Sequence, residues 1–176
     1  MCTENEKQKL IYQINYIRQE KLDEKIRNNI ENVIKKYPDV YIKTRIKEED
    51  SAIQKLDIRN FEYADQISDL LGVMIITKDI EEAYKIEADL QKVFPNSIEE
   101  DYIKNPKFGY QSIHLNCKIE KEIPLEIQIK TEKMKIAQEL VHDSIYKNNN
   151  LNVKTKNMLS SMAYENINRI FNKKYI

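Results

Sequence analysis

The chain has 176 residues, of which 33% are charged, and its 29 Lys and Arg residues balance 29 Asp and Glu residues. This length fits one domain with a real core, and the zero net charge gives no reason to expect a nucleic-acid coat or an anionic membrane partner. The longest nearly continuous apolar run, Leu70–Ile76, is far too short to span a bilayer, so we expect a cytoplasmic protein with no membrane partner. Only two histidines and two cysteines are present, which excludes most His/Cys metal sites.

The first third of the chain predicts one or two amphipathic helices that end at Pro38. Its apolar residues recur at helical or near-helical spacing: Leu10, Ile14, Ile17, Ile26, Ile30 and Val33. From Val40 to Lys47 apolar and polar residues alternate, which predicts a strand. One face of this strand is basic, because Arg45 and Lys47 project the same way.

A helix and a strand-then-helix unit are predicted next. Ser51 followed by Gln54 has the form of a capping box, so we expect a helix to begin at Ser51. The apolar segment 70–77 predicts a buried strand. Asp79 with Glu82 then predicts the start of a further helix.

After Pro95 the sequence predicts a loop, followed by two alternating segments, 112–119 and 125–130, that form an antiparallel hairpin. Thr131 begins a helix that extends to about Tyr146, and a last helix covers about 153–172. The sum is an α/β (α+β) fold, a single domain with a mixed β-sheet flanked by helices. We divide the chain into an N-terminal helical segment (1–39), a core (40–147) and a C-terminal helix (148–176).

Phosphate binding would rest on side-chain cations and metal ions, because the only glycines, Gly72 and Gly109, cannot form a glycine-rich phosphate loop. Arg45 and Lys47 share a strand face and Lys55 follows on the next helix, so three positive charges could converge on a polyphosphate. An ordinary solvated edge strand and helix would show the same spacing.

Two carboxylates stand beside apolar strands, where an acid needs a partner. Asp69 precedes the most apolar strand, and Glu126 lies inside a strand rich in aliphatic residues, with Gln128 facing the same way. On neighbouring strands, the two acids could share Mg²⁺, which takes one or two protein carboxylates and fills its shell with phosphate oxygens and water. The solvent-facing half of a hairpin strand would also explain Glu126.

Segment 101–114 mixes aromatic residues, lysines and a glycine directly before a strand, as is typical of a ligand loop. Tyr110 offers a flat face for a nucleobase, a contact worth roughly 1–3 kcal/mol, while Lys104 and Lys107 can meet phosphates. His114 taken alone is more often a packed histidine. His142 followed by Asp143 is reminiscent of HD phosphohydrolases, but a single further histidine cannot complete their metal site.

From about Thr44 to Lys147 the chain resembles the synthetase domain of the RelA/SpoT family, which implies a nucleotidyltransferase-like fold. Residues 45–55 resemble the pattern R-x-K-x-x-x-S-x-x-x-K, and residues 69–73 (DLLGV) resemble the start of a metal-binding strand. The run GYQSIH at 109–114 resembles an acceptor loop, and EIQIKT at 126–131 is similar to E-I-Q-I-R-T. The spacing of Met134, His142, Tyr146 and Lys147 resembles that of the small alarmone synthetases.

The resemblance implies an enzyme that transfers the β,γ-pyrophosphate of ATP to the ribose 3′-hydroxyl of GDP or GTP, with Mg²⁺ as cofactor. It implies that Asp69 and Glu126 bind the metal and are catalytic, and that Tyr110 stacks on guanine. The ATP-binding residues would be Arg45, Lys47, Ser51 and Lys55. The acceptor-binding residues would be Lys104, Lys107, Tyr110, Gln111, His114 and Gln128.

Departures from the family pattern leave alternatives open. Met74 stands where most relatives have an arginine. A second hypothesis keeps the chemistry but makes the 3′ end of tRNA the acceptor, as in toxic members of the family, which implies an antitoxin. A third is a non-catalytic nucleotide-binding module, although the retention of Asp69 and Glu126 argues against it. Small synthetases often build a tetramer where this chain has only a short terminal helix, so both a monomer and a homo-oligomer stay open.

Overall fold

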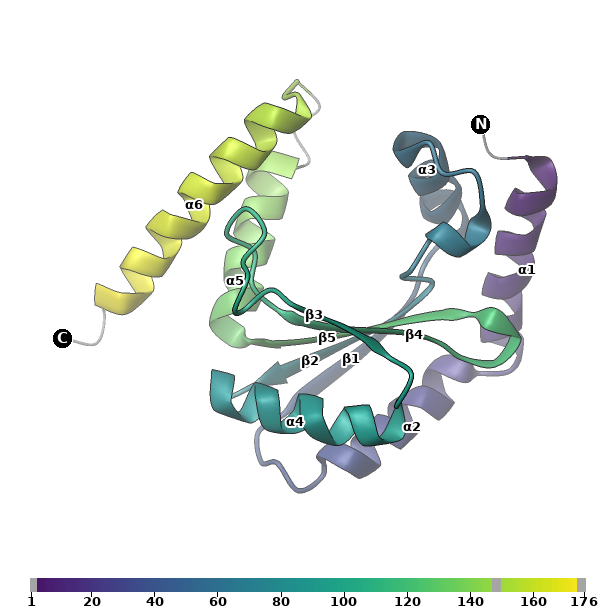
Figure 1. The fold of residues 1–176 in the computed structure, drawn as a ribbon, viewed down its shortest axis with the longest axis horizontal. Coiled ribbons are helices and arrows are strands. Elements are labelled where there is room, and N and C mark those ends of the chain that lie inside the picture. The colour runs from purple at the N-terminus through teal and green to yellow at the C-terminus, as the bar shows by residue number, and fades with distance from the viewer. Residues whose placement is uncertain (1–2, 147–149, 174–176) are drawn as a thin grey trace.

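The computed structural model describes residues 3–146 and 150–173, so Lys147 and the expected boundary at 147/148 lie outside the described residues. Its centre is one five-stranded sheet with the order β1-β2-β5-β4-β3 (Figure 1). Only β2 and β5 pair in parallel, and the other neighbours are antiparallel. The strands are β1 (Tyr41–Ile46), β2 (Leu71–Thr77), β3 (Ile98–Asp101), β4 (Ile113–Lys118) and β5 (Pro124–Thr131). The predicted mixed sheet and the β4–β5 hairpin are therefore confirmed.

The helices lie on both sides of this sheet. In Figure 1, α2 and α4 cover one face, while α3 and α5 stand on the other side, with α6 alongside α5. The helices are α1 (Glu4–Gln19), α2 (Leu22–Ile34), α3 (Glu49–Arg59), α4 (Ile80–Val93), α5 (Glu132–Val141) and α6 (Val153–Lys173). A π-helical turn, His142–Tyr146, follows α5, and short 3₁₀ turns occur at Ala64–Gln66 and Glu120–Glu122.

Strand alternation explains which face is covered. Side chains such as Val73, Ile75 and Ile127 are almost completely buried in the main core beneath α2 and α4. Leu10 of α1 and Ile30 of α2 belong to the same core, so the N-terminal helices are part of the single domain. Within the described ranges, no helix combines the length and apolar character needed to cross a bilayer.

Two local predictions were wrong. The segment predicted as a loop after Pro95 contains β3, a short and polar edge strand. The α3 helix begins at Glu49 rather than Ser51, and its N-cap Glu48 makes no capping bond through its side chain. Arg18 of α1 instead pairs with Glu48 at 2.7 Å and with Glu49 at 3.2 Å, so contacts from another helix hold this end.

The other predicted helix starts are confirmed. The Asp79 carboxylate accepts from the backbone N–H of Glu82 at 2.9 Å at the start of α4. The Thr131 hydroxyl accepts from the backbone N–H of Met134 at 3.4 Å at the start of α5. The last helix, α6, matches its predicted range to within one residue.

Candidate active site

The sheet face opposite α2 and α4 carries polar residues in two cross-strand rows. Arg45, Gly72, Glu126 and Asn116 are successive partners across four strands. The next row runs Lys43, Met74, Gln128, His114 and Glu100. Because paired residues in a sheet project to the same side, strand order brings the predicted acids, cations and acceptor residues onto one surface.

Asp69, two residues before β2 begins, lies at the centre of the predicted cation cluster. Its carboxylate accepts from Lys47 Nζ at 2.7 Å and from Lys55 Nζ at 2.9 Å, and Arg45 Nη2 lies 3.6 Å away. Burial acts to raise the pKa of Asp69, but the two ammonium groups outweigh burial and hold it below its ordinary value. The predicted cation cluster therefore forms, and Asp69 holds its three cations in position.

Glu126 occupies the neighbouring strand and is partly buried. His114 Nδ1 lies 3.3 Å from Glu126 Oε1, and Gln128 Nε2 donates to Glu126 Oε2 at 2.6 Å. Burial acts to raise the pKa of Glu126, but the contacts with His114 and Gln128 lower it overall, while the charge of Asp69 acts to raise it. Glu126 and Asp69 are thus close enough for their charges to interact.

Tyr110 is held in a defined orientation beside this acid. Its Oη lies 2.8 Å from His114 Nε2, and its ring is edge-on to the His114 ring at a centroid distance of 5.7 Å. Gly109 before it has φ +85°, and a β-carbon there would lie 2.5 Å from Cβ of Tyr164 on α6. Only glycine fits this close approach, so α6 fixes the base of the loop that carries Tyr110.

Lys130 and Gln138 also lie at this face, although neither was predicted as a site residue. Lys130 Nζ is fully buried and donates to Gln138 Oε1 at 2.6 Å, to Gln128 Oε1 at 2.7 Å and to Tyr110 Oη at 3.2 Å. Strand alternation offered a signal, because Lys130 is four residues from Glu126 and so shares its face. Its burial depends on α5 and the loop, which periodicity in β5 does not reveal.

A cavity of about 790 Å³ opens beside Tyr110, bounded by α3, the loop, α5 and α6. Its lining is Ile58, Arg59, Lys107, Phe108, Tyr110, Gln138, His142, Val153, Lys156, Asn157 and Tyr164. This lining contains aromatic and cationic side chains and no acid. Its size lies within the range of small-molecule sites, and its chemistry suits an aromatic anion.

The remaining predicted residues are only partly brought together. Lys107 lines the cavity, whereas Lys104 turns to Asp101 at 3.0 Å and lies over the Tyr84 ring of α4, away from the cavity lining. Ser51 is exposed on α3, one turn before Lys55. Gln111 is half-buried in the segment that joins the loop to β4.

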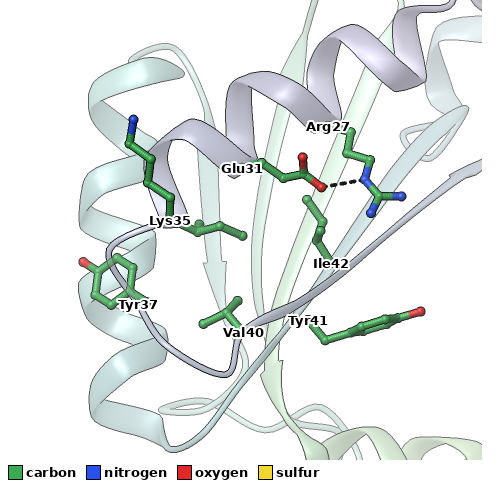
Figure 2. Close-up of a pocket in the computed structure, with 8 residues that line it drawn as sticks. Arg27, Glu31, Lys35, Tyr37, Val40, Tyr41 and Ile42 are labelled. Atoms are coloured by element: carbon green, nitrogen blue, oxygen red, sulfur yellow. Dashed lines mark hydrogen bonds and ion pairs between the residues drawn. The ribbon is translucent and has the colours of Figure 1, made fainter.

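A second hollow, of about 370 Å³, lies between α2 and the edge strand β1 (Figure 2). An ion pair between Arg27 Nε and Glu31 Oε1, 2.7 Å long, stands at its rim, and Tyr41 and Ile42 lie on its strand side. None of the predicted site residues lines this hollow. Of the predicted site residues, Lys107 and Tyr110 line the larger cavity instead.

The fold and this face define a nucleotidyltransferase-like domain with an acid-and-cation site. The chain belongs to the RelA/SpoT family: the family described as "Region found in RelA / SpoT proteins" matches residues 44–151, more than half of the chain. GTP pyrophosphokinase YwaC of Bacillus subtilis is 32% identical over 128 residues, covering 64% of this chain and 61% of that protein. Probable GTP diphosphokinase RSH3 of Arabidopsis thaliana is 37% identical over 79 residues, which is 43% of this chain but 11% of the plant protein.

Solved structures share the fold. Small alarmone synthetase 2 from Bacillus subtilis matches with a TM-score of 0.65 and 26% identity, over 97% of this chain and 96% of that one. Small alarmone synthetase 1 bound to its product pppGpp gives 0.68 and 20%, over 91% and 93%. The Type VI effector Tas1, in complex with its immunity protein, gives 0.67 and 13%, over 96% and 100%.

Proposed function

We propose that this chain is an ATP-dependent pyrophosphokinase that transfers the β,γ-pyrophosphate of ATP to the ribose 3′-hydroxyl of GDP or GTP. The observation that carries the proposal is the position of Glu126. On one side, Glu126 shares a cross-strand row with Arg45, which belongs to the cation cluster around Asp69. On the other side, His114 links Glu126 to Tyr110. A donor polyphosphate and an acceptor nucleoside placed on these two sides would meet at this carboxylate.

The roles follow from charge and position. Arg45, Lys47 and Lys55 would bind the ATP phosphates, because three converging cations neutralise the charge of a polyphosphate. The 3′-oxygen attacks the β-phosphorus, the bond from that phosphorus to the α-phosphate oxygen breaks, and AMP leaves. Glu126 accepts the hydroxyl proton, and positioning with charge stabilisation supplies most of the acceleration.

Mg²⁺ in proteins usually binds one or two carboxylates, and Asp69 and Glu126 would supply them here. Bound Mg²⁺ would neutralise phosphate charge. Among the described residues no three Asp, Glu, His or Cys side chains gather as a metal site. Nucleotide oxygens and water would therefore complete the shell. Because its own lysines occupy the Asp69 carboxylate, we expect metal and ATP to bind more tightly together than either does alone.

The acceptor assignment rests on the aromatic, cationic cavity beside Tyr110, on relatives named for GTP, and on pppGpp as the product of small alarmone synthetase 1. Purified protein would be incubated with γ-labelled ATP, Mg²⁺ and, separately, GDP, GTP, GMP and deacylated tRNA. Label on GDP or GTP supports the proposal, whereas label on tRNA replaces it with the toxin-like alternative. ATP binding without transfer to any acceptor would leave the non-catalytic module.

Two variants test the roles. Glu126→Gln should abolish transfer while the fold is retained, and Glu132→Gln, on the exposed first turn of α5, is the matched control. Tyr110→Ala should raise the KM for the acceptor more than the KM for ATP, and Tyr12→Ala on the exposed side of α1 is its control. Full turnover by the Glu126 variant would remove the assigned role of that carboxylate.

A further inference from the structure

Lys130 is a buried cation whose three hydrogen bonds go to neutral oxygens. Its ammonium contacts Tyr110 Oη, Gln128 Oε1 and Gln138 Oε1, which belong to the acceptor loop, β5 and α5. An ammonium has three donor protons, so these contacts use all of them. Burying a charge without a carboxylate in contact is costly, so its position calls for an explanation other than stability.

Two of the three bonds lead to Glu126 and close a circuit of five side chains, which we call the polar circuit: Lys130, Tyr110, His114, Glu126 and Gln128. An ammonium only donates and an ionised carboxylate only accepts. On one arm Lys130 donates to Gln128 Oε1, which leaves Gln128 Nε2 to donate to Glu126 Oε2. On the other, Lys130 donates to Tyr110 Oη, Tyr110 Oη lies 2.8 Å from His114 Nε2, and His114 Nδ1 lies 3.3 Å from Glu126 Oε1. With the imidazole proton on Nδ1, the Tyr110 hydroxyl donates to Nε2 and Nδ1–H faces the carboxylate.

In this tautomer, every bond of the polar circuit points from Lys130 towards Glu126. We propose that Lys130 is a positioning residue for the transfer reaction, which holds the acceptor platform Tyr110 and both donors to Glu126 in one fixed arrangement. The inference rests on the proposed function, since it gives the circuit a purpose only if Glu126 and Tyr110 act there. Without Lys130, the oxygens of Tyr110 and Gln128 lose their common donor, and both side chains become free to turn away.

The surroundings of Lys130 are consistent with a protonated donor at neutral pH. Burial lowers the pKa of Lys130 to about 8, and the charges of Glu126 and Glu139 act in the opposite direction. The centroid of the Tyr110 ring also lies 5.3 Å from Lys130 Nζ, so the π-face of this ring attracts the ammonium as well. The same contact fixes one side of the Tyr110 ring.

Steady-state kinetics with γ-labelled ATP and GDP would test the proposal. We expect Lys130→Met to lower kcat about tenfold to a hundredfold and to raise the KM for GDP, with the KM for ATP within about twofold of the unchanged protein. Lys130→Arg, which keeps an obligate donor, should recover most of the loss. Lys92→Met, an exposed lysine of α4 paired with Asp89, is the matched control and should behave as the unchanged protein.

A second measurement does not need turnover. The chain has only two histidines, so a His142→Asn background leaves one imidazole for nitrogen-15 NMR. We expect the His114 Nδ1–H proton to be protected from water exchange in this background and to lose protection when Lys130→Met is added. An effect of Lys130→Met on the KM for ATP equal to that for GDP, or unchanged kinetics with unchanged protection, would overturn the inference.

Two further outcomes separate the possible failures. If Lys130→Met does not fold, Gln138→Leu removes one bond to the ammonium and should lower kcat by a smaller factor without changing the KM for ATP; unchanged kinetics would count against the inference. If the unchanged protein transfers no pyrophosphate but the His114 proton is protected and responds to Lys130→Met, the circuit stands and the proposed function fails. Normal turnover in Lys130→Met would instead leave the function and remove the role of Lys130.

Discussion

The burial of Lys130 predicts a pH dependence of stability that can be isolated with one substitution. Burial lowers the pKa of this lysine from its ordinary value of 10.5 to about 8 in the folded protein. Between these values the unfolded chain holds the proton and the folded chain has lost it, so unfolding takes up a proton. The free energy of unfolding due to this group therefore rises with pH across the window, and the full cost of burying the charge is present below pH 8.

The magnitude follows from the width of this window. Each pH unit contributes about 1.4 kcal/mol, so the complete interval from pH 8 to 10.5 is worth about 3 kcal/mol. At pH 7, Lys130→Met removes the cost of the buried charge, which stabilises the variant. It also removes the hydrogen bonds to Tyr110, Gln128 and Gln138, each worth about 1 kcal/mol, and this loss offsets the gain. The two proteins should thus have similar stability at neutral pH, and the unchanged protein should become the more stable one as pH rises.

Urea unfolding of both proteins from pH 7 to 10 would measure the difference. Titrations that the two proteins share cancel, and the slopes m should agree, since the folds are the same. With a slope of about 2 kcal/mol per molar urea, the midpoints should separate by roughly 1 M over the accessible part of the window. A difference in free energy that stays constant from pH 7.5 to 10 would refute the reasoning, because it would mean that burial does not change the proton affinity of Lys130.

Three further substitutions probe the site and its supports. Asp69→Asn leaves Lys47 charged and unpaired with only 11% of its side chain exposed, so we expect a loss of about 3 kcal/mol in urea unfolding, and an unchanged midpoint would contradict this. Gly109→Ala should cost about 2 kcal/mol or more in the same assay, and an unchanged urea midpoint would contradict the close approach of Gly109 to Tyr164. Asp79→Ala removes the N-cap of α4, and thermal melts should show a loss of about 1 kcal/mol with activity unchanged.

Much of the local structure could be predicted because its causes lie within a few residues. Alternation in 40–47 and 125–130 predicted β1 and β5, and the caps at Asp79 and Thr131 predicted two helix starts. The strand β3 was missed because Ile98–Asp101 is short, polar and not alternating, so its pairing with β4 is what makes it a strand. The start of α3 was misplaced because contacts from Arg18, thirty residues away, stabilise it.

The candidate site divides in the same way. The residues Arg45, Lys47, Asp69, Glu126 and Tyr110 could be selected from the sequence, because their types and their phase along a strand are local properties. The direction of the Lys104 side chain, which points to Asp101 and the Tyr84 ring of α4, could not be predicted from the sequence. A flexible side chain pairs with whichever acid the fold brings near.

The sequence by itself determined which strand faces are apolar and which carry the acids and cations, because the two-residue repeat of a strand depends only on neighbouring positions. Only the tertiary structure decided that β5 lies between β2 and β4, and this order brings Asp69, which precedes β2, close to Glu126 on β5. The same holds for Lys130, whose burial and polar circuit arise where β5, α5 and the Tyr110 loop meet. Such contacts join residues far apart in the chain, and no local pattern encodes them.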